Sequence, residues 1–303
     1  MSRARRALLV VGDVVTDVVA RHRTPLAPAT DTAAEIRTLP GGAGANAACW
    51  AARSGGEVRL LGRVGADAAD WHERALRAAG VRPLFVRDAE AATATVIALV
   101  DASAERTFLT DSGAALRLSP ADWSPGLLDG VARLHLSGYL FFAGPSRETA
   151  LRALRDATEA GVPVSVDPAS AGFLAALGAD RFLAAVEGAE VLLPNADEAR
   201  ALTGRAEPGR AAAELSRRFP LVVVTLGAAG ALVAEDGAVT ARVAAPPARP
   251  VDSTGAGDAF TGAFLAARLA GADPVRAAEA GCRAGAEAVT VVGGRPPAAP
   301  TDG

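Results

Sequence analysis

Lysine is absent from this chain of 303 residues, in which all 31 basic residues are arginine. The absence of lysine excludes a Walker A loop, the phosphate-binding lysine of a protein kinase and a Schiff-base amine. Any phosphate chemistry must therefore rely on backbone N–H groups, arginine and a metal ion. Glutamine is absent as well, and the two asparagines, Asn46 and Asn195, both stand in short motifs at predicted helix starts. This placement indicates that the two amides do something that Ala or Asp could not.

The chain also has little of what other function classes need. Its net charge is −3 and its arginines are spread out, so no basic surface for nucleic acid is expected. The two cysteines, Cys49 and Cys282, lie in alanine-rich helical contexts, which is typical of buried thiols rather than of a disulfide or metal site. No apolar run is long enough for a signal peptide or for the roughly 18 apolar residues of a membrane span. We expect a cytoplasmic protein with no membrane or nucleic-acid partner.

Short apolar runs alternate with longer helical patterns along most of the chain. Strands are predicted at residues 7–11, 58–61, 131–136, 162–166, 191–193 and 221–225. Helices are predicted at residues 67–79, 146–160, 256–270 and 274–289, with Ser146 as the N-cap of the second. This alternation predicts an α/β fold with a doubly wound, mostly parallel sheet.

Two regions break the alternation, at residues 14–39 and 93–111. Both consist of short β-prone pieces separated by proline or polar residues, and residues 101–105 look like a turn. We expect these regions to form a small, mostly antiparallel sheet that acts as a lid on the α/β core of residues 1–13, 40–92 and 112–303. Because an unpaired sheet edge often needs a partner, the lid is also predicted to pair with a second subunit in a homodimer.

The most informative motif is the stretch 251–260, Val-Asp-Ser-Thr-Gly-Ala-Gly-Asp-Ala-Phe. Gly255 and Gly257 permit a tight turn, and the N–H groups of Ala256, Gly257 and Asp258 lie free at a helix start, where phosphate binds. A carboxylate inside such an anion pocket can accept the proton of a hydroxyl that receives a phosphoryl group. The alternative is that Asp258 only caps the helix.

Three further motifs each allow a structural and a functional interpretation. The first motif covers residues 41–48 and contains Gly41, Gly42 and Asn46. Its glycines either let the backbone approach a ligand closely or simply form the entry to a helix. Asn195 and Glu198 follow a predicted strand and either form a capping box or hold a hydrated Mg²⁺. The remaining motif contains Thr225, Gly227 and Gly230. These residues either contact a ligand or form a tight turn between two strands.

The order of these motifs after an early strand ending in Gly12-Asp13 resembles the ribokinase-like (PfkB) family of carbohydrate and nucleoside kinases. The resemblance covers residues 8–294. It implies that Asp258 is the catalytic base and that the N–H groups of residues 255–258 form an anion hole. It further implies that sugar hydroxyls are bound by Asp13, Gly41, Gly42 and Asn46.

The same resemblance implies where ATP and metal ions bind. ATP phosphates would contact Asn195, Thr225, Gly227 and Gly230, and adenine would lie near the last two helices, around Gly285. Asn195 and Glu198 would hold Mg²⁺ through water, and Asp252 with Thr254 would be candidates for K⁺. Arg106, at the start of a predicted lid strand, could reach an anionic group or remain solvated.

These observations predict an ATP-dependent kinase that phosphorylates a hydroxymethyl group of a small sugar or sugar derivative. A nucleoside kinase of the same family is the nearest alternative, with lid residues such as Ile36, Phe108 and Leu109 available to a base. A non-catalytic sugar or nucleotide sensor is a second alternative, although a sensor has no need of Asp258. A dinucleotide-dependent oxidoreductase is disfavoured because no Gly-x-Gly-x-x-Gly follows the first strand.

Overall fold

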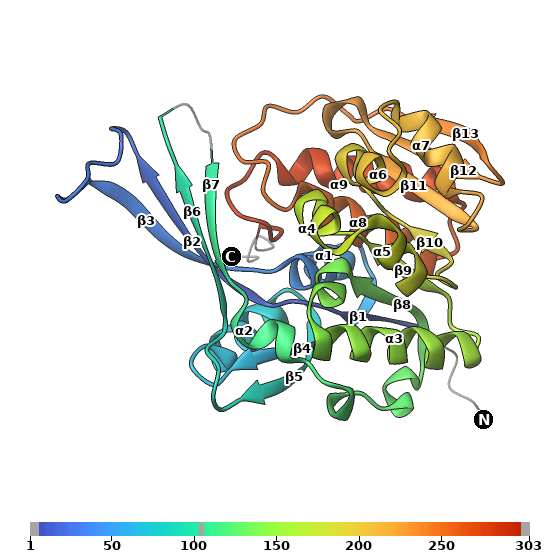
Figure 1. Cartoon of the computed structure of the whole chain (residues 1–303), viewed down its shortest axis with the longest axis horizontal. Helices are drawn as coiled ribbons and strands as arrows, with labels where there is room; N and C mark the ends of the chain where they lie inside the picture. Colours follow the sequence, from blue (N-terminus) through green and yellow to red (C-terminus); the bar gives the residue numbers. More distant parts are fainter. Residues whose placement is uncertain (1–5, 103–105, 298–303) are drawn as a thin grey trace, which may run out of the picture.

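The computed structural model describes residues 6–102 and 106–297, and within them the strands form two sheets (Figure 1). In the larger sheet all neighbouring strands pair in parallel except at one end, where β12 pairs antiparallel with both β11 and β13. In spatial order the strands are β13 (Ala238–Val243), β12 (Ala231–Glu235), β11 (Leu221–Thr225), β10 (Val191–Leu192), β9 (Val164–Asp167), β8 (Val131–Ser137), β1 (Ala7–Val11), β4 (Glu57–Gly65) and β5 (Val81–Asp88).

The strand order reverses direction beside β1. From β1 the chain adds β4 and β5 on one side, and β8 to β11 on the other. The carboxyl ends of the parallel strands share one edge of the sheet, and ligands of open α/β sheets bind at this reversal. The residues that follow β1, β8 and β9 therefore converge on one place.

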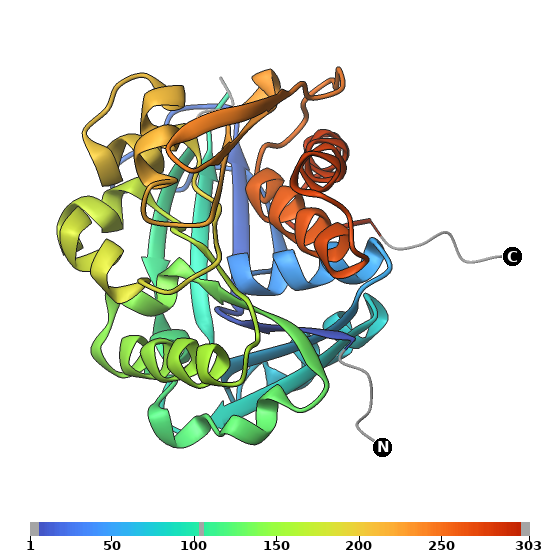
Figure 2. The same ribbon diagram turned by 90° about the vertical axis from the view of Figure 1, so that its right-hand side faces the viewer.

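Helices cover both faces of the large sheet (Figure 2). Strand β1 is fully buried, with Leu8 and Val10 facing one helical layer and Leu9 and Val11 the other. The first layer consists of α1 (Ala43–Arg53), α2 (Ala69–Ala78), α8 (Ala256–Leu269) and α9 (Pro274–Ala288). The second consists of α3 (Gly144–Glu159), α4 (Ala171–Leu177), α5 (Ala179–Ala185), α6 (Ala196–Thr203) and α7 (Pro208–Leu215). The short 3₁₀ helices are η1 (Gly113–Arg117), η2 (Pro120–Asp122), η3 (Pro125–Leu128), η4 (Gly138–Phe142) and η5 (Gly227–Ala229).

The smaller sheet stands apart from the main body and consists of the two regions for which a lid is predicted, so it is called the lid below (Figure 1). Its order is β3 (Ala34–Gly41), β2 (Val15–His22), β6 (Ala94–Val100) and β7 (Arg106–Asp111), with only the β2–β6 pair parallel. Side chains alternate between its faces, so one face of the lid is turned toward the core and the other away from it. Residues 103–105 of the predicted turn lie outside the described residues.

The predicted fold class is confirmed, and the predicted helix start at Ser146 is wrong. Helix α3 begins at Gly144 with Pro145 in its first turn, a position that suits proline because the missing N–H is not needed there. The Ser146 hydroxyl instead donates to the Leu140 carbonyl at 2.7 Å and fixes η4 against the helix. Both cysteines are buried and free, as predicted. In the described ranges, no helix combines the length and the apolarity that crossing a membrane requires.

Candidate active site

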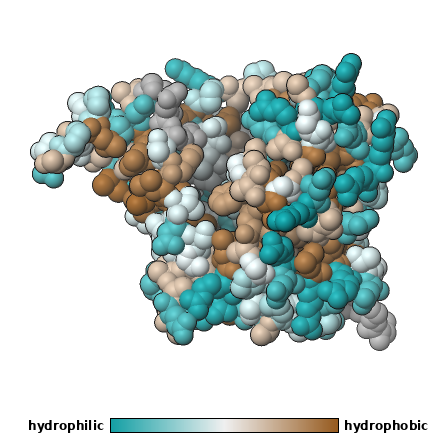
Figure 3. Space-filling model, in the orientation of Figure 1, coloured by the Kyte–Doolittle hydropathy of each residue, from teal (hydrophilic) through white to brown (hydrophobic). Residues whose placement is uncertain are grey.

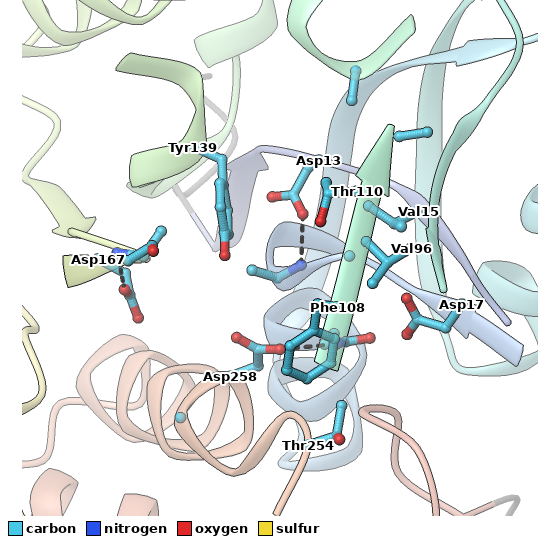
Figure 4. A pocket seen from close by; sticks show the side chains of 18 of the residues that line it. Asp13, Val15, Asp17, Val96, Phe108, Thr110, Tyr139, Asp167, Thr254 and Asp258 are labelled. Atoms are coloured by element: carbon cyan, nitrogen blue, oxygen red, sulfur yellow. Dashed lines mark hydrogen bonds between the residues drawn. The ribbon is translucent and has the colours of Figure 1, made fainter. Parts of the chain in front are cut away.

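A cavity of about 480 Å³ lies between the inner face of the lid and the edge of the large sheet where the parallel strands end (Figure 4). Asp13 follows β1, Asp167 ends β9, and Thr225 ends β11, so three strand ends contribute to its wall. Asp258 lies across from Asp13, on the opposite side of the space that Tyr139 faces. The fold thus brings together residues from the whole length of the chain.

Asp258 is the third residue of α8, yet it does not cap that helix. Gly255 is the N-cap residue, and the start of the helix has no side-chain cap. The Asp258 carboxylate accepts a hydrogen bond from Asn46 Nδ2 at 2.8 Å. The interpretation of Asp258 as a simple helix cap is therefore wrong, and its carboxylate faces the cavity.

The pKa of Asp258 is raised from 3.8 to about 8. Burial is the main cause, and the negative charges of Asp167 and Asp13 act in the same direction, whereas the hydrogen bond from Asn46 lowers the value. A carboxyl group that titrates near neutrality can both hold and release a proton under working conditions. This property is typical of a general acid or base.

The start of α8 is open toward the cavity. Gly255 adopts φ 73°, and a Cβ placed there would lie 2.4 Å from the Cα of Gly294, so only glycine fits. At Gly257 a Cβ would meet no atom within 4 Å, because this residue faces the cavity. Unpaired N–H groups at an open helix start attract anions. The predicted anion pocket is consistent with this geometry.

The start of α1 is held by Asp13. Its buried carboxylate accepts hydrogen bonds from the backbone N–H groups of Ala43 at 2.7 Å and Gly44 at 3.2 Å, and from the Ser137 hydroxyl at 2.8 Å. Gly42 has φ 97°, and a Cβ there would lie 2.6 Å from the Asp13 carbonyl oxygen. The glycine-rich motif is thus a helix entry, and it also brings Asp13 and Gly42 to the wall of the cavity.

Asp17 lies on β2, four residues after Asp13. It lines the cavity from β2 and leaves no room for a side chain at Gly41, where a Cβ would overlap its carboxylate. Burial and the charge of Asp13 raise its pKa to about 6, while Arg295 acts in the opposite direction. Gly41 therefore leaves the space that the Asp17 carboxylate occupies. Gly41 itself, a predicted sugar contact, is not part of the cavity wall.

Asn195 and Glu198 form the capping box that begins α6. Asn195 Oδ1 accepts from the Glu198 N–H at 2.9 Å, and the Glu198 carboxylate accepts from the N–H and Nδ2 of Asn195 at 2.9 and 2.7 Å. Both side chains also line the cavity, so the structural interpretation does not exclude the functional one. Burial and the nearby charge of Asp167 raise the pKa of Glu198. A cation beside Glu198 would stabilise the ionised form of this carboxylate.

Asp252 and Thr254 join the cavity from the loop before α8. The Asp252 carboxylate accepts from the N–H groups of Thr254 at 2.9 Å and Gly293 at 3.0 Å, and ties this loop to the segment after α9. In the described part of the chain, no group of three or more His, Cys, Asp or Glu side chains is arranged to hold a metal ion. A cation here would need carbonyl, water or phosphate oxygens as further ligands.

Three of the predicted nucleotide contacts lie away from the cavity wall. Gly227 is exposed in η5, and Gly230, with φ 93°, closes the tight turn between β11 and β12. Gly285 lies on α9, where a Cβ would be 3.3 Å from the Ala256 carbonyl oxygen. Arg106 begins β7, and its side chain is outside the described part of the structure. The roles of these four residues remain predictions.

Asp167 and Tyr139 are among the residues of the cavity wall that were missed in the sequence. Asp167 accepts hydrogen bonds from the Ala169 N–H at 2.8 Å and the Thr261 hydroxyl at 3.1 Å, and burial raises its pKa. It follows a buried strand just as Asp13 does, and this pattern could have identified it. Tyr139, the single tyrosine of the chain, follows β8 and points its hydroxyl into the cavity (Figure 4).

The sequence matches the family model "pfkB family carbohydrate kinase" over residues 5–302. The chain belongs to the PfkB family of carbohydrate kinases. It is 34% identical over 272 residues to a fructokinase of Klebsiella pneumoniae, an alignment that spans 85% of this chain and 82% of that protein.

Solved structures agree with this assignment. The chain is similar to a putative ribokinase II from Escherichia coli in complex with ATP and Mg²⁺, with a TM-score of 0.85, 25% identity, and coverage of 95% of this chain and 94% of that one. An adenosine kinase from Sinorhizobium meliloti has the same fold, with a TM-score of 0.88, 24% identity and coverage of 97% and 96%. The chain is thus a carbohydrate kinase of the PfkB family.

Proposed function

We propose that this PfkB kinase transfers the γ-phosphoryl group of ATP to a hydroxymethyl group of a small sugar or sugar derivative, with Asp258 as the general base. The observation that carries the proposal is the placement of Asp258. Its carboxylate stands at the open start of α8, faces the cavity, and is held by Asn46 from the glycine-rich motif. Asp258 would accept the hydroxyl proton as the new O–P bond forms and the bond to ADP breaks.

Backbone groups would stabilise the transferred phosphoryl group. Residues 255–258 begin α8, where the first N–H groups lack intrahelical partners, and Gly257 leaves the approach to them open. Because the chain has no lysine, these donors and the helix dipole would offset much of the negative charge in the transition state. The sugar hydroxyls would face Asp13, Asp17 and Asn46 on the lid side of Asp258.

The donor set of the cavity fits Mg²⁺. Glu198 supplies a buried carboxylate and Asn195 an amide, and Mg²⁺ is usually held by one or two carboxylates, several waters and substrate phosphates. When bound, Mg²⁺ would neutralise charge on the β- and γ-phosphates. Asp252 and the Thr254 carbonyl would be the candidates for K⁺. The complex of the Escherichia coli relative with ATP and Mg²⁺ supports the choice of phosphate donor and metal.

The outer face of the lid supports a homodimer. Side chains on this face form an apolar row across all four strands, and Ile36 and Leu109 are 64% and 54% exposed. The row consists of Ile36 on β3, Val18 on β2, Ile97 and Leu99 on β6, and Leu109 on β7. A second copy of the lid carries the same apolar row, so the two rows would cover each other across a two-fold axis.

Acceptor-dependent ADP release by the purified protein with Mg²⁺, K⁺ and ATP tests the proposal. The panel would contain ribose, fructose, fructose phosphates, 2-keto-3-deoxygluconate, adenosine, inosine and pseudouridine. One acceptor turned over well above the ATPase background supports a kinase and names its substrate. ATP binding with no turnover of any acceptor would favour the non-catalytic sensor instead.

A further inference from the structure

The cavity is lined by acidic side chains. Among the described residues, no arginine or histidine side chain reaches its wall. Arg295 acts electrostatically on Asp17, but it is not part of the wall. The acidic residues that line the cavity are Asp13, Asp17, Asp111, Asp167, Glu198, Asp252 and Asp258.

This distribution of charge determines which net charge of the acceptor molecule the cavity favours. The triphosphate of a nucleotide would meet the start of α8 and a metal ion, whereas the lid side offers an acceptor Asp13, Asp17 and Asp111. A phosphate or carboxylate on the acceptor would face like charges there, and none of the described side chains of this wall is a cation, so such an arrangement is unfavourable. Carboxylates instead accept hydrogen bonds from the hydroxyl groups of a neutral molecule. The lining therefore selects against acidic acceptors.

A second feature of the cavity is an aromatic wall on the core side. The Tyr139 ring packs edge-on against Phe173 with a centroid distance of 5.8 Å, and Phe173 stacks on Phe142 at 5.1 Å. All three rings line the cavity, and Phe173 is 41% exposed. Such a wall can cover one face of a flat ring.

The lid presents a matching apolar surface on the opposite side. Val15 and Val96 line the cavity on the lid side and Tyr139 on the core side, and Phe108 also lines it from β7 (Figure 4). Phe108 is 53% exposed, and apolar side chains gather on the lid strands beside the hollow between lid and core (Figure 3). Two apolar surfaces on either side of an open space suit a flat ring, because each face of the ring can be covered.

We propose that the acceptor is an uncharged sugar that carries a planar ring, as a nucleoside does. The ring lies between Tyr139 and the inner face of the lid near Phe108 and Val96, and the sugar hydroxyls face Asp13, Asp17 and Asn46. The Tyr139 hydroxyl stays protonated, because burial and the surrounding carboxylates raise its pKa, so it can donate to the acceptor. This inference rests on the proposed kinase function and selects the substrate class within it.

The test measures binding without turnover. Because Tyr139 is the single tyrosine, protein labelled with 3-fluorotyrosine gives one ¹⁹F signal that reports on the cavity. The probes are uridine, pseudouridine, inosine and adenosine, compared with ribose, fructose and fructose 6-phosphate. We expect at least one nucleoside to bind more than about ten-fold tighter than ribose or fructose and to shift the signal, since stacking of a base contributes on this scale. Fructose 6-phosphate should bind more weakly than fructose.

Two variants and a matched control, followed by calorimetry, separate stacking from a general loss of structure. Tyr139→Leu and Phe108→Ala should each weaken nucleoside binding about ten-fold and weaken the binding of ribose much less. Leu26→Ala, at an exposed site in the loop between β2 and β3 and outside the cavity, should change neither. Equal losses for ribose and nucleosides in the Tyr139 variant would overturn the ring site.

Two other outcomes would also overturn the inference. They are preferred binding of fructose 6-phosphate and a failure of every nucleoside to bind at millimolar concentration. Nucleosides that bind through Tyr139 but are not phosphorylated would support the ring site and contradict the proposed kinase function. The two claims therefore fail in distinguishable ways.

Discussion

Asn46 donates a hydrogen bond to Asp258 at 2.8 Å and thereby joins the starts of α1 and α8, although the two residues are 212 positions apart in the chain. The two helices pack side by side, and both begin at glycine-rich turns next to the cavity. The hydrogen bond stabilises the ionised form of a carboxyl group that burial would otherwise keep protonated. Through this contact, the glycine-rich motif near residue 42 lowers the pKa of the proposed base, Asp258.

The first prediction concerns the dependence of kcat/KM on pH. A general base must be ionised, and the pKa of Asp258 is raised to about 8 in the free protein. We expect kcat/KM to rise about ten-fold per pH unit below this value and to level off above it. Steady-state kinetics between pH 5.5 and 9.5 checks this, and a kcat/KM that stays constant from pH 6 to 9 would contradict it.

Asn46→Ala provides a sharper version of the same test. Its removal takes away the hydrogen bond that lowers the pKa of Asp258, so the inflection should move to higher pH. The position of the inflection is the readout, because Asn46 is also proposed to bind the sugar and the rate alone would not separate the two roles. An inflection that does not move would show that this hydrogen bond does not tune the base.

The second prediction compares Gly257→Ala with Gly255→Ala. A Cβ at Gly257 meets no atom of the protein and would project toward the anion pocket, so kcat should fall on the order of 10²-fold without loss of stability. A Cβ at Gly255 would clash with Gly294, and its left-handed backbone costs about 1–2 kcal/mol for other residues, so this variant should unfold at a lower temperature. Thermal melts and steady-state kinetics of both variants check the contrast.

The third prediction concerns Mg²⁺. Glu198→Gln should raise the Mg²⁺ concentration needed for half-maximal activity, because the variant loses the proposed carboxylate beside the ion. Glu207→Gln is the matched control, since Glu207 also accepts hydrogen bonds from the first turn of its helix, α7, but lies outside the cavity. An identical Mg²⁺ dependence for the two variants would remove Glu198 from the metal site.

The fourth prediction concerns assembly through the lid. Ile36→Asp places a charge in the apolar row on the outer face and should convert a dimer into a monomer. Val239→Asp, at a 40% exposed position on β13 away from the lid, should leave the dimer intact. Light scattering at high protein concentration measures both, and a monomeric wild-type protein would refute the lid dimer.

Much of the fold could be predicted because local patterns determine it. The apolar run of β11 and the glycine turn before α8 act over a few residues, and the structure agrees with both. Asp258 stands out as a candidate base for the same reason, since the glycine turn beside it is a local pattern. The start of α3 was misjudged because Ser146 has a tertiary partner, the Leu140 carbonyl, that no local pattern reveals.

The site residues that the sequence did not reveal come from strands that are distant in the chain and adjacent in the sheet. Asp167 and Tyr139 reach the cavity only because β8 and β9 end beside β1, and the strand order is not written in any short motif. The pKa of Asp258 likewise depends on Asp13 and Asp167, which are distant in sequence. Sequence patterns could point to Asp258 as a candidate base, but they could not predict the acidic and aromatic walls around it.

The fifth and central prediction is that Asp258→Asn abolishes turnover without harming the fold. Because the folded protein raises the pKa of Asp258 above 3.8, the wild type loses stability as pH rises through about 8, and the variant escapes this loss. The variant should therefore melt at the same temperature as wild type near pH 4 and at a higher one above pH 8. This difference serves as evidence that the variant is folded.

The decisive measurement is kcat of Asp258→Asn, with the acceptor found in the panel, at saturating ATP and Mg²⁺. We predict a loss of at least about 10²-fold, within the range that a general base contributes, while binding of the acceptor persists. A variant that binds the acceptor and turns it over at nearly the wild-type rate would contradict the assignment of Asp258 as the base.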